Sequence, residues 1–269
     1  MNIKLPEESK NSRKWEQGRV LIVWWSHTYY GAPIMNGLWA EKWWADLIHL
    51  FLPSIHSEAA KNYSLNFQVN PFKWDNISDS DIDSILKLSK QCHSMLIWSG
   101  MDHSIWNSKE CIIKILEKSD LPTVIDAGAL FPEILDIKRK AIWTITPHDK
   151  EFERLFWEKP DQENLREFSK KYDITILKKW PTDLVSWANN HIFENKTWHY
   201  RMRVWWTWDV LAWLVTSLIS QWLSPYDACI SWTHMLWKCW EKLAETQFSY
   251  TAQELANAIP IVMSELWEL

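Results

Sequence analysis

The stretch VWWTWDVLAW, residues 204–213, places four tryptophans among ten residues, just before and inside an expected amphipathic helix. Tryptophan has the largest side chain, yet this spacing is typical of glycine. With glycine in place of tryptophan, the stretch becomes VGGTGDVLAG, which is a glycine-rich loop that opens a helix. Such a loop holds phosphate through the backbone N–H groups at a helix N-terminus. Read with glycine, the stretch therefore predicts a phosphate-binding turn.

The composition of the whole chain points the same way. Its 269 residues include only 5 glycines and 23 tryptophans, whereas average usage would give roughly 19 glycines. Tryptophan also stands where strands end or turns begin, namely after VLIV (Trp24, Trp25), after MLI (Trp98), after ILKK (Trp180) and in WANN (Trp187). We hypothesise that most of these residues are glycine in the living protein. A genome that decodes UGA as glycine, translated by a table that reads UGA as tryptophan, would give this pattern. The alternative is a genuinely tryptophan-rich protein whose indoles pack in the core or stack on carbohydrate.

Short apolar runs alternate with helical patterns along the chain. Each run is rich in β-branched residues and is followed by a turn, as in strands buried on both faces of a parallel sheet. This alternation predicts an α/β fold, a three-layer α/β/α sandwich with a mostly parallel central sheet and helices on both faces. We see no linker and expect a single domain over residues 1–269. The expected elements are strands at 20–23, 94–98, 123–126, 141–146 and 174–179, helices over 81–92 and 108–118, and a hairpin over 183–195 around Asn189-Asn190.

The helix that follows the opening stretch shows apolar residues at helical spacing. Its apolar positions predict one buried stripe, with a polar second face. The apolar set is Val210, Leu211, Leu214, Val215, Leu218 and Ile219, and the polar set is Thr216, Ser217, Ser220 and Gln221. Asp209 falls at the start of this helix, where the backbone dipole favours an anion. From the residues alone, Asp209 is equally well explained as a helix cap and as a catalytic base.

The bulk properties exclude several classes of protein. A net charge of -5 with spread basic residues argues against binding to nucleic acid or a membrane surface. No signal peptide and no apolar run of membrane-spanning length is present, so we expect a cytoplasmic protein. The spacing of the four cysteines suggests neither a zinc site nor a disulfide framework, and no dedicated metal-ligand cluster is visible. We expect reduced core thiols at Cys92, Cys111, Cys229 and Cys239.

Read with glycine for tryptophan, five ordered motifs resemble the ADP-dependent NAD(P)H-hydrate dehydratases, a family with the ribokinase-like fold. The resemblance runs from about residue 14 to residue 260. The motifs are KWEQGRVLIVWWSHTYYGAP, ITPHDKEFERLF, KKWPTDLVS, TWHYRMRVWWTWDVLAW and QWLSPYDACISWTHMLWKCWEKLAE. Two departures bear on the site. Asp149 and Lys150 replace a Pro-Gly turn, and Gly128 replaces the second acid of a DADAL motif whose first acid is Asp126.

The resemblance implies a repair reaction on hydrated NADH or NADPH. The enzyme, a hydro-lyase, would use ADP to phosphorylate the ring hydroxyl, after which phosphate leaves and AMP remains. Asp209 would be the catalytic base that accepts the hydroxyl proton. Mg²⁺ is inferred only from the nucleotide chemistry. A homo-oligomer is expected. The implied substrate-side residues are Ala32, Gly100, His148 and Asp209, and the implied ADP-side residues are Lys179, Trp180, Pro181, Thr182, Trp205, Trp206, Thr207 and Trp208.

Two other readings stay open at this point. A ribokinase-like kinase for a small alcohol, such as a vitamin precursor, would share the loop and Asp209 but use ATP and release a stable phosphorylated product. A non-catalytic protein follows if the tryptophans are genuine and fill the nucleotide cleft. For single residues, Lys179 is alternatively a solvated strand-end charge, and His148 an ordinary surface histidine. The sequence does not separate NADH from NADPH hydrate, and ADP is favoured over ATP only by resemblance.

Overall fold

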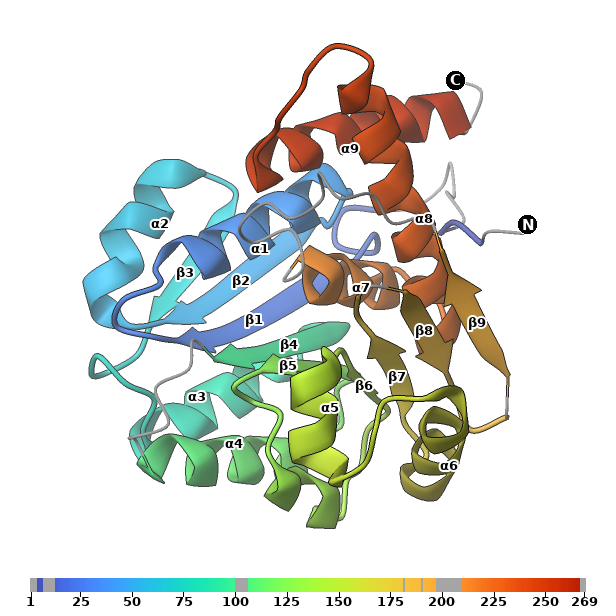
Figure 1. The fold of residues 1–269 in the computed structure, drawn as a ribbon. Helices are drawn as coiled ribbons and strands as arrows, with labels where there is room; N and C mark the ends of the chain where they lie inside the picture. The colour runs from blue at the N-terminus through green and yellow to red at the C-terminus, as the bar shows by residue number, and fades with distance from the viewer. Residues whose placement is uncertain are drawn as a thin grey trace.

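A nine-stranded sheet forms the middle layer of the described chain (Figure 1). The computed structural model describes residues 4–6, 13–99, 106–180, 182–189, 191–196 and 210–266. The spatial order is β3-β2-β1-β4-β5-β6-β7-β8-β9. Neighbouring strands pair in parallel from β3 across to β7, and β8 and β9 add an antiparallel hairpin. The strands are β1 Arg19–Trp25, β2 Leu47–Leu52, β3 Phe67–Pro71, β4 Ser94–Ser99, β5 Thr123–Ala127, β6 Trp143–Ile145, β7 Thr175–Lys178, β8 Asp183–Ser186 and β9 Ile192–Asn195.

Helices cover both faces of this sheet, and each face has its own hydrophobic core. One core lies under α1 Gly31–Lys42, α7 Val210–Ser220, α8 Pro225–Ala244 and α9 Ala252–Leu266. The other lies under α3 Asp79–Ser89, α4 Trp106–Lys118, α5 Asp149–Phe156 and α6 Gln162–Tyr172. The short helix α2 Ser57–Tyr63 contacts β3 near one edge. The predicted three-layer α/β/α sandwich with a mostly parallel sheet is confirmed.

The strands predicted from apolar runs are all present, whereas β2 and β3 were not predicted. The hairpin predicted over 183–195 is also present, as β8 and β9. The edge strand β3 reads FQVNP, and most of its residues are only partly buried. It ends at Pro71, which a strand tolerates at an edge because proline has no N–H to donate to the ladder. A short run with so few buried side chains carries little pattern to detect.

Helix α7 differs from the prediction of a single buried stripe. Its apolar residues from Leu211 to Ile219 are buried as expected, but Thr216, Ser217 and Ser220 are buried as well. The helix lies between the sheet and the helices α1 and α8, so no face of it meets solvent fully. The buried hydroxyls bond to carbonyl oxygens of the same helix; Thr216 Oγ1, for example, donates to Ala212 O over 2.7 Å. These hydrogen bonds within the helix satisfy hydroxyl groups that the sequence pattern predicted to face solvent.

Candidate active site at the carboxyl ends of the strands

A buried ion pair joins the ends of β5 and β7. Lys179 Nζ lies 2.7 Å from Asp126 Oδ1, and the two side chains are 4% and 0% exposed. Burial raises the pKa of the Asp126 carboxyl, and the adjacent Lys179 ammonium opposes that shift. The reading of Lys179 as a solvated strand-end charge is therefore wrong. Its ammonium is held inside the protein, at the edge where ligands bind in open α/β sheets.

His148 begins helix α5 just after strand β6. Its Nδ1 accepts a hydrogen bond from the Glu151 N–H over 3.2 Å, and its own backbone N–H donates to Glu151 Oε2 over 2.9 Å. This reciprocal pair is a capping box with histidine in the place of serine or threonine. Because Nδ1 is the acceptor here, the neutral ring carries its proton on Nε2. The ring is 45% exposed, and its Nε2 lies 3.4 Å from Glu151 Oε1, so a ligand at Nε2 would meet this carboxylate as well.

The backbones of His148 and Lys179 lie side by side in an isolated parallel bridge. The Lys179 N–H donates to Pro147 O over 2.9 Å, which ties the segment after β7 to the segment after β6. Beside this bridge, Lys178 Nζ donates to the Trp180 carbonyl over 3.0 Å and lies 3.3 Å from Asp149 Oδ1. Residues implied on the substrate side and on the ADP side thus meet at the ends of β6 and β7.

The Trp180 segment forms a tight turn before β8. The Trp180 N–H donates to Asp183 Oδ1 over 3.2 Å, and Asn195 of β9 donates to Asp183 Oδ2 over 3.1 Å. Trp180 has a positive φ of 47°, in the left-handed region. Thr182 lies within the same short turn and is partly exposed. The turn is therefore fixed from both sides and presents its backbone at the strand ends.

The opposite half of the strand-end edge lies at β1 and β4. Ala32 is fully buried in the first turn of α1. Ser26 Oγ, just past β1, accepts hydrogen bonds from the N–H groups of Thr28 and Tyr29 over 3.2 and 3.1 Å. Two strands, β4 and β5, separate β1 from β6. At about 4.8 Å per strand, the ends of β1 and β6, near Ala32 and His148, lie roughly 14 Å apart along the sheet edge. An extended ligand could reach both ends, whereas one small group could not.

Indoles fill the space at the ends of β1 and β4. The rings of Trp24 and Trp98 stack with centroids 6.1 Å apart, and the Trp213 ring from the first turns of α7 meets Trp98 edge-on at 6.5 Å. Trp24 and Trp98 thus lie together on these neighbouring strands. Trp25 lies in the core on the other face of the sheet. Trp180 follows β7, three strands away from β4.

Several predicted residues lie outside the described part of the chain. They are Gly100, Pro181, Trp205, Trp206, Thr207, Trp208 and Asp209. Sequence reasoning singled out Asp126 without finding its partner, and it missed Lys178 and Glu151. The spacing of His148 and Glu151, three residues apart just after a strand, is a signal that could have located the cap.

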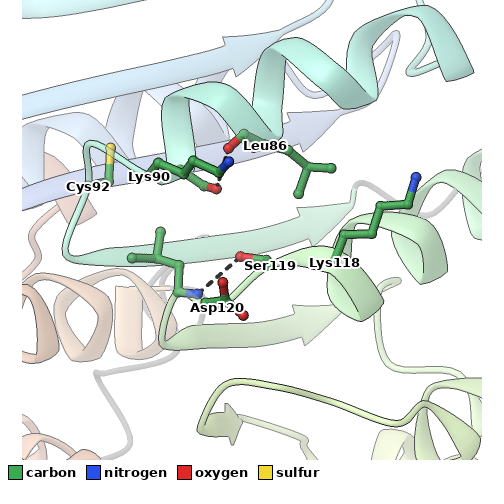
Figure 2. A pocket seen from close by; sticks show the side chains of 8 residues that line it. Leu86, Lys90, Cys92, Lys118, Ser119 and Asp120 are labelled. Atoms are coloured by element: carbon green, nitrogen blue, oxygen red, sulfur yellow. Dashed lines mark hydrogen bonds between the residues drawn. The ribbon is translucent and has the colours of Figure 1, made fainter.

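A separate cavity of about 340 Å³ opens at the other end of the sheet (Figure 2). It is lined by the ends of α3 and α4 and by the residues just before β5, including Lys90, Lys118 and Asp120. Since Cys92 and Leu121 precede β4 and β5, this cavity lies at the amino ends of the strands, away from the Asp126–Lys179 pair.

No helix in the described ranges is both long and apolar enough to cross a membrane. The same ranges contain no group of three or more His, Cys, Asp or Glu side chains placed to hold a metal ion.

The layered sheet has the ribokinase-like fold, as two solved structures show. A solved ribokinase-like superfamily protein from Enterococcus faecalis is similar in fold, with a TM-score of 0.83 at 18% identity, over 97% of this chain and 92% of that one. A second similar structure is the ADP/ATP-dependent NAD(P)H-hydrate dehydratase of Bacillus subtilis co-crystallised with ATP and Mg²⁺, with a TM-score of 0.82 at 18% identity, over 97% and 94% of the two chains.

The sequence then narrows the class to a family. The profile of the NAD(P)H-hydrate dehydratase family matches residues 20–261. The ADP-dependent (S)-NAD(P)H-hydrate dehydratase of Nitrosopumilus maritimus is 31% identical over 232 residues, which are 83% of this chain and 80% of that protein. The chain belongs to the NAD(P)H-hydrate dehydratase family.

Proposed function

We propose that this protein dehydrates hydrated NADH or NADPH with ADP as phosphoryl donor, giving NAD(P)H, AMP and phosphate. The observation that carries the proposal is the family match over residues 20–261, which includes β1 from its second residue, the strands β2 to β9 and the Asp126–Lys179 pair. The ADP-dependent relative from Nitrosopumilus maritimus favours ADP over ATP. A ring hydroxyl is a poor leaving group, and phosphorylation makes it a good one.

The reaction requires a base and a phosphate cradle at the start of α7. We propose that Asp209 accepts the hydroxyl proton while the hydroxyl oxygen attacks the β-phosphorus of ADP, and the bond to the bridging oxygen breaks to release AMP. Backbone N–H groups of residues 205–208 stabilise the charge on the transferred group. Phosphate then leaves with the C–O electron pair, and loss of a proton from the neighbouring ring atom restores the double bond. These residues precede Val210, where α7 begins against β1, β4 and β5.

We propose that the end of β6 and β7 is where the two substrates meet. His148 offers its Nε2 hydrogen to the hydrated nicotinamide nucleotide, while Ala32 at the start of α1 and Gly100, which follows β4 in the sequence, approach that nucleotide. The turn from Lys179 through Trp180 and Pro181 to Thr182 lines the adenylate. The bridge between His148 and Lys179 supports this arrangement because it fixes the two halves against each other. In this role the Lys179 ammonium acts through Asp126 to hold the turn, so Lys179 is a positioning residue.

Mg²⁺ would neutralise the diphosphate. In nucleotide sites this ion takes one or two protein carboxylates and several phosphate or water oxygens, so a dedicated protein cage is not needed. We further propose that residues 1–269 form one domain, as the continuous sheet from β3 to β9 and the lack of a sequence linker suggest. We also propose that the protein is a cytoplasmic homo-oligomer.

The test is a reconstitution with purified protein. Mixing it with hydrated NADH and ADP should restore the NADH absorbance band and release AMP and phosphate in equal amounts. Omission of ADP is the control. Accumulation of a stable phosphorylated product from ATP and a small alcohol, with no NADH formed, would instead favour the kinase. No turnover of any kind by folded protein would favour the non-catalytic reading.

A further inference from the structure

Tryptophan occupies most of the left-handed backbone positions in the described chain. Seven residues other than glycine have positive φ there, and five of them are tryptophan. Clashes with the Cβ atom make this region costly for L-residues, and a bulky side chain in it is an outlier. Glycine adopts it freely because it has no Cβ. The five are Trp15 (76°), Trp44 (70°), Trp157 (60°), Trp180 (47°) and Trp222 (72°).

Two of these residues stand at the position that most often requires glycine, one past a helix C-cap. After α1, the Ala45 N–H bonds to Ala40 O and the Trp44 N–H to Glu41 O, over 2.9 and 3.2 Å. This pair of bonds defines a Schellman motif, with Trp44 at its left-handed residue.

Helix α7 ends in the same way. The Leu223 N–H bonds to Leu218 O and the Trp222 N–H to Ile219 O, over 3.3 and 3.1 Å. Trp222 is again the left-handed residue. The chain also contains a motif of this kind after α6, and there the left-handed residue is Asp173, a type that tolerates the conformation.

The side chains at these positions bring no compensating burial. Trp44, Trp157 and Trp222 are 53%, 80% and 74% exposed. Trp157 is the C-cap of α5, also in the left-handed region. A large apolar side chain that remains mostly in water gains little from the hydrophobic effect. The Trp222 ring lies beside that of His93, with centroids 4.8 Å apart, but burial does not explain the tryptophans at residues 44 and 157.

The buried tryptophans show a second, independent misfit. The indole Nε1 atoms of Trp24, Trp39, Trp213 and Trp232 are buried without a hydrogen-bond partner within the described residues. A buried indole N–H normally finds an acceptor. These four side chains crowd the interface of α1, α7 and α8 with the sheet, where Trp39 and Trp232 meet edge-on at 5.4 Å. Glycine has no such donor, and it lets a helix approach a strand closely.

We infer that the protein made by the cell carries glycine at these tryptophan positions, at the helix ends as well as in the core. The inference rests on backbone angles and unpaired indoles and not on the proposed function. It has one structural consequence for that function. With glycine at Trp24, Trp98 and Trp213, the stacked indoles at the ends of β1 and β4 disappear, and the start of α7 gains open space beside the strand ends.

The direct test is peptide mass spectrometry on the protein isolated from its own cells. Peptides that cover Trp44, Trp157 and Trp222 should have masses that correspond to glycine at these positions. Tryptophan at these three positions would overturn the inference. Because the readout is a mass, an inactive enzyme leaves the result intact, and the failure of the proposed function is recognised separately.

A second test measures backbone strain by thermal unfolding. In the chain as written, Trp44→Gly, Trp157→Gly and Trp222→Gly should each raise the unfolding midpoint. Trp74→Gly is the matched control, because Trp74 is 63% exposed but is absent from the positive-φ residues. There, glycine only adds freedom to the unfolded chain and should lower the midpoint.

If the chain with 23 tryptophans does not fold, the same question is tested by putting single tryptophans back into a chain that carries glycine. With Trp→Gly at all 23 positions as the parent, versions that keep tryptophan at residue 44, 157 or 222 should melt below the parent, while the version that keeps Trp74 should not. Equal or higher midpoints for the first three would contradict the inference.

Discussion

Nζ of Lys179 lies 2.7 Å from Oδ1 of Asp126, and this contact ties the end of β7 to the end of β5 across the intervening strand β6. Both side chains are withdrawn from water. The contact therefore offsets much of the free-energy cost of burying the two charges. The pair also anchors the turn at Trp180, whose backbone we place against the adenylate.

Removal of both partners should cost less stability than the two single removals added together. Asp126→Asn and Lys179→Met should each lower the free energy of unfolding by about 3–5 kcal/mol, because each leaves a buried group without its partner. The double variant should lose clearly less than the sum of the two. Urea unfolding measures all three values. Glu58→Gln is the control, since the exposed pair of Glu58 with Lys61 should contribute less than about 1 kcal/mol. Additive losses at Asp126 and Lys179 would show that the contact is not energetically coupled.

His148 caps α5, and we propose that it also donates a hydrogen bond to the hydrate; a pair of substitutions separates these two roles. His148→Ala removes both the cap of α5 and the Nε2 donor, so it should cost about 1 kcal/mol of stability and raise KM for the hydrate. His148→Asn keeps a capping oxygen and loses only the ring donor. It should therefore keep the unfolding midpoint of the parent while still raising KM for the hydrate, with little change in KM for ADP. Equal changes in KM for both substrates would mean that His148 acts only through the fold.

The stability of the protein should fall as the pH drops below about 6.5. The neutral ring of His93 accepts a hydrogen bond at Nε2 from the Arg19 guanidinium, with the nearer nitrogen 2.9 Å away. Burial, and secondly Arg19, lower the pKa of His93 from its ordinary value of 6.5. The unfolded chain therefore takes up the proton first, and unfolding is favoured as the pH falls through this range.

A variant assigns part of this pH effect to His93. His93→Gln keeps an acceptor for Arg19 but does not titrate. Its unfolding midpoint should therefore change less between pH 7.5 and pH 5.5 than that of the parent, and the difference is the contribution of the one histidine that was removed. Burial also lowers the pKa values of His49 and His234, so the variant should still lose some stability as the pH falls. An unchanged slope in His93→Gln would remove His93 from the explanation.

The sequence pattern predicted the layers of this fold because strands buried on both faces read as continuous apolar runs, as VLIV does in β1. It could not predict the burial of Ser217 and Ser220, because the layer formed by α1 and α8 over α7 depends on contacts between distant segments. The Asp126–Lys179 contact could not be predicted for the same reason, since the two residues are 53 positions apart in the sequence. The left-handed angles of Trp44 and Trp222 were also invisible in the sequence, although the glycine-like spacing of tryptophan pointed toward them.

The proposed base makes the sharpest chemical prediction. Asp209→Asn keeps the size of the side chain and removes its ability to accept a proton, so turnover should fall about a hundredfold or more. ADP affinity should change little, because backbone N–H groups and the turn at Trp180 hold the nucleotide in this proposal. Turnover is followed by recovery of the NADH band, and ADP binding by calorimetry on the same preparation. Asp209→Glu is the matched control, because it keeps a carboxylate at a longer reach and should recover part of the rate lost in Asp209→Asn. If Asp209→Asn turns over like the parent, Asp209 is only the cap of α7 and another group takes the proton.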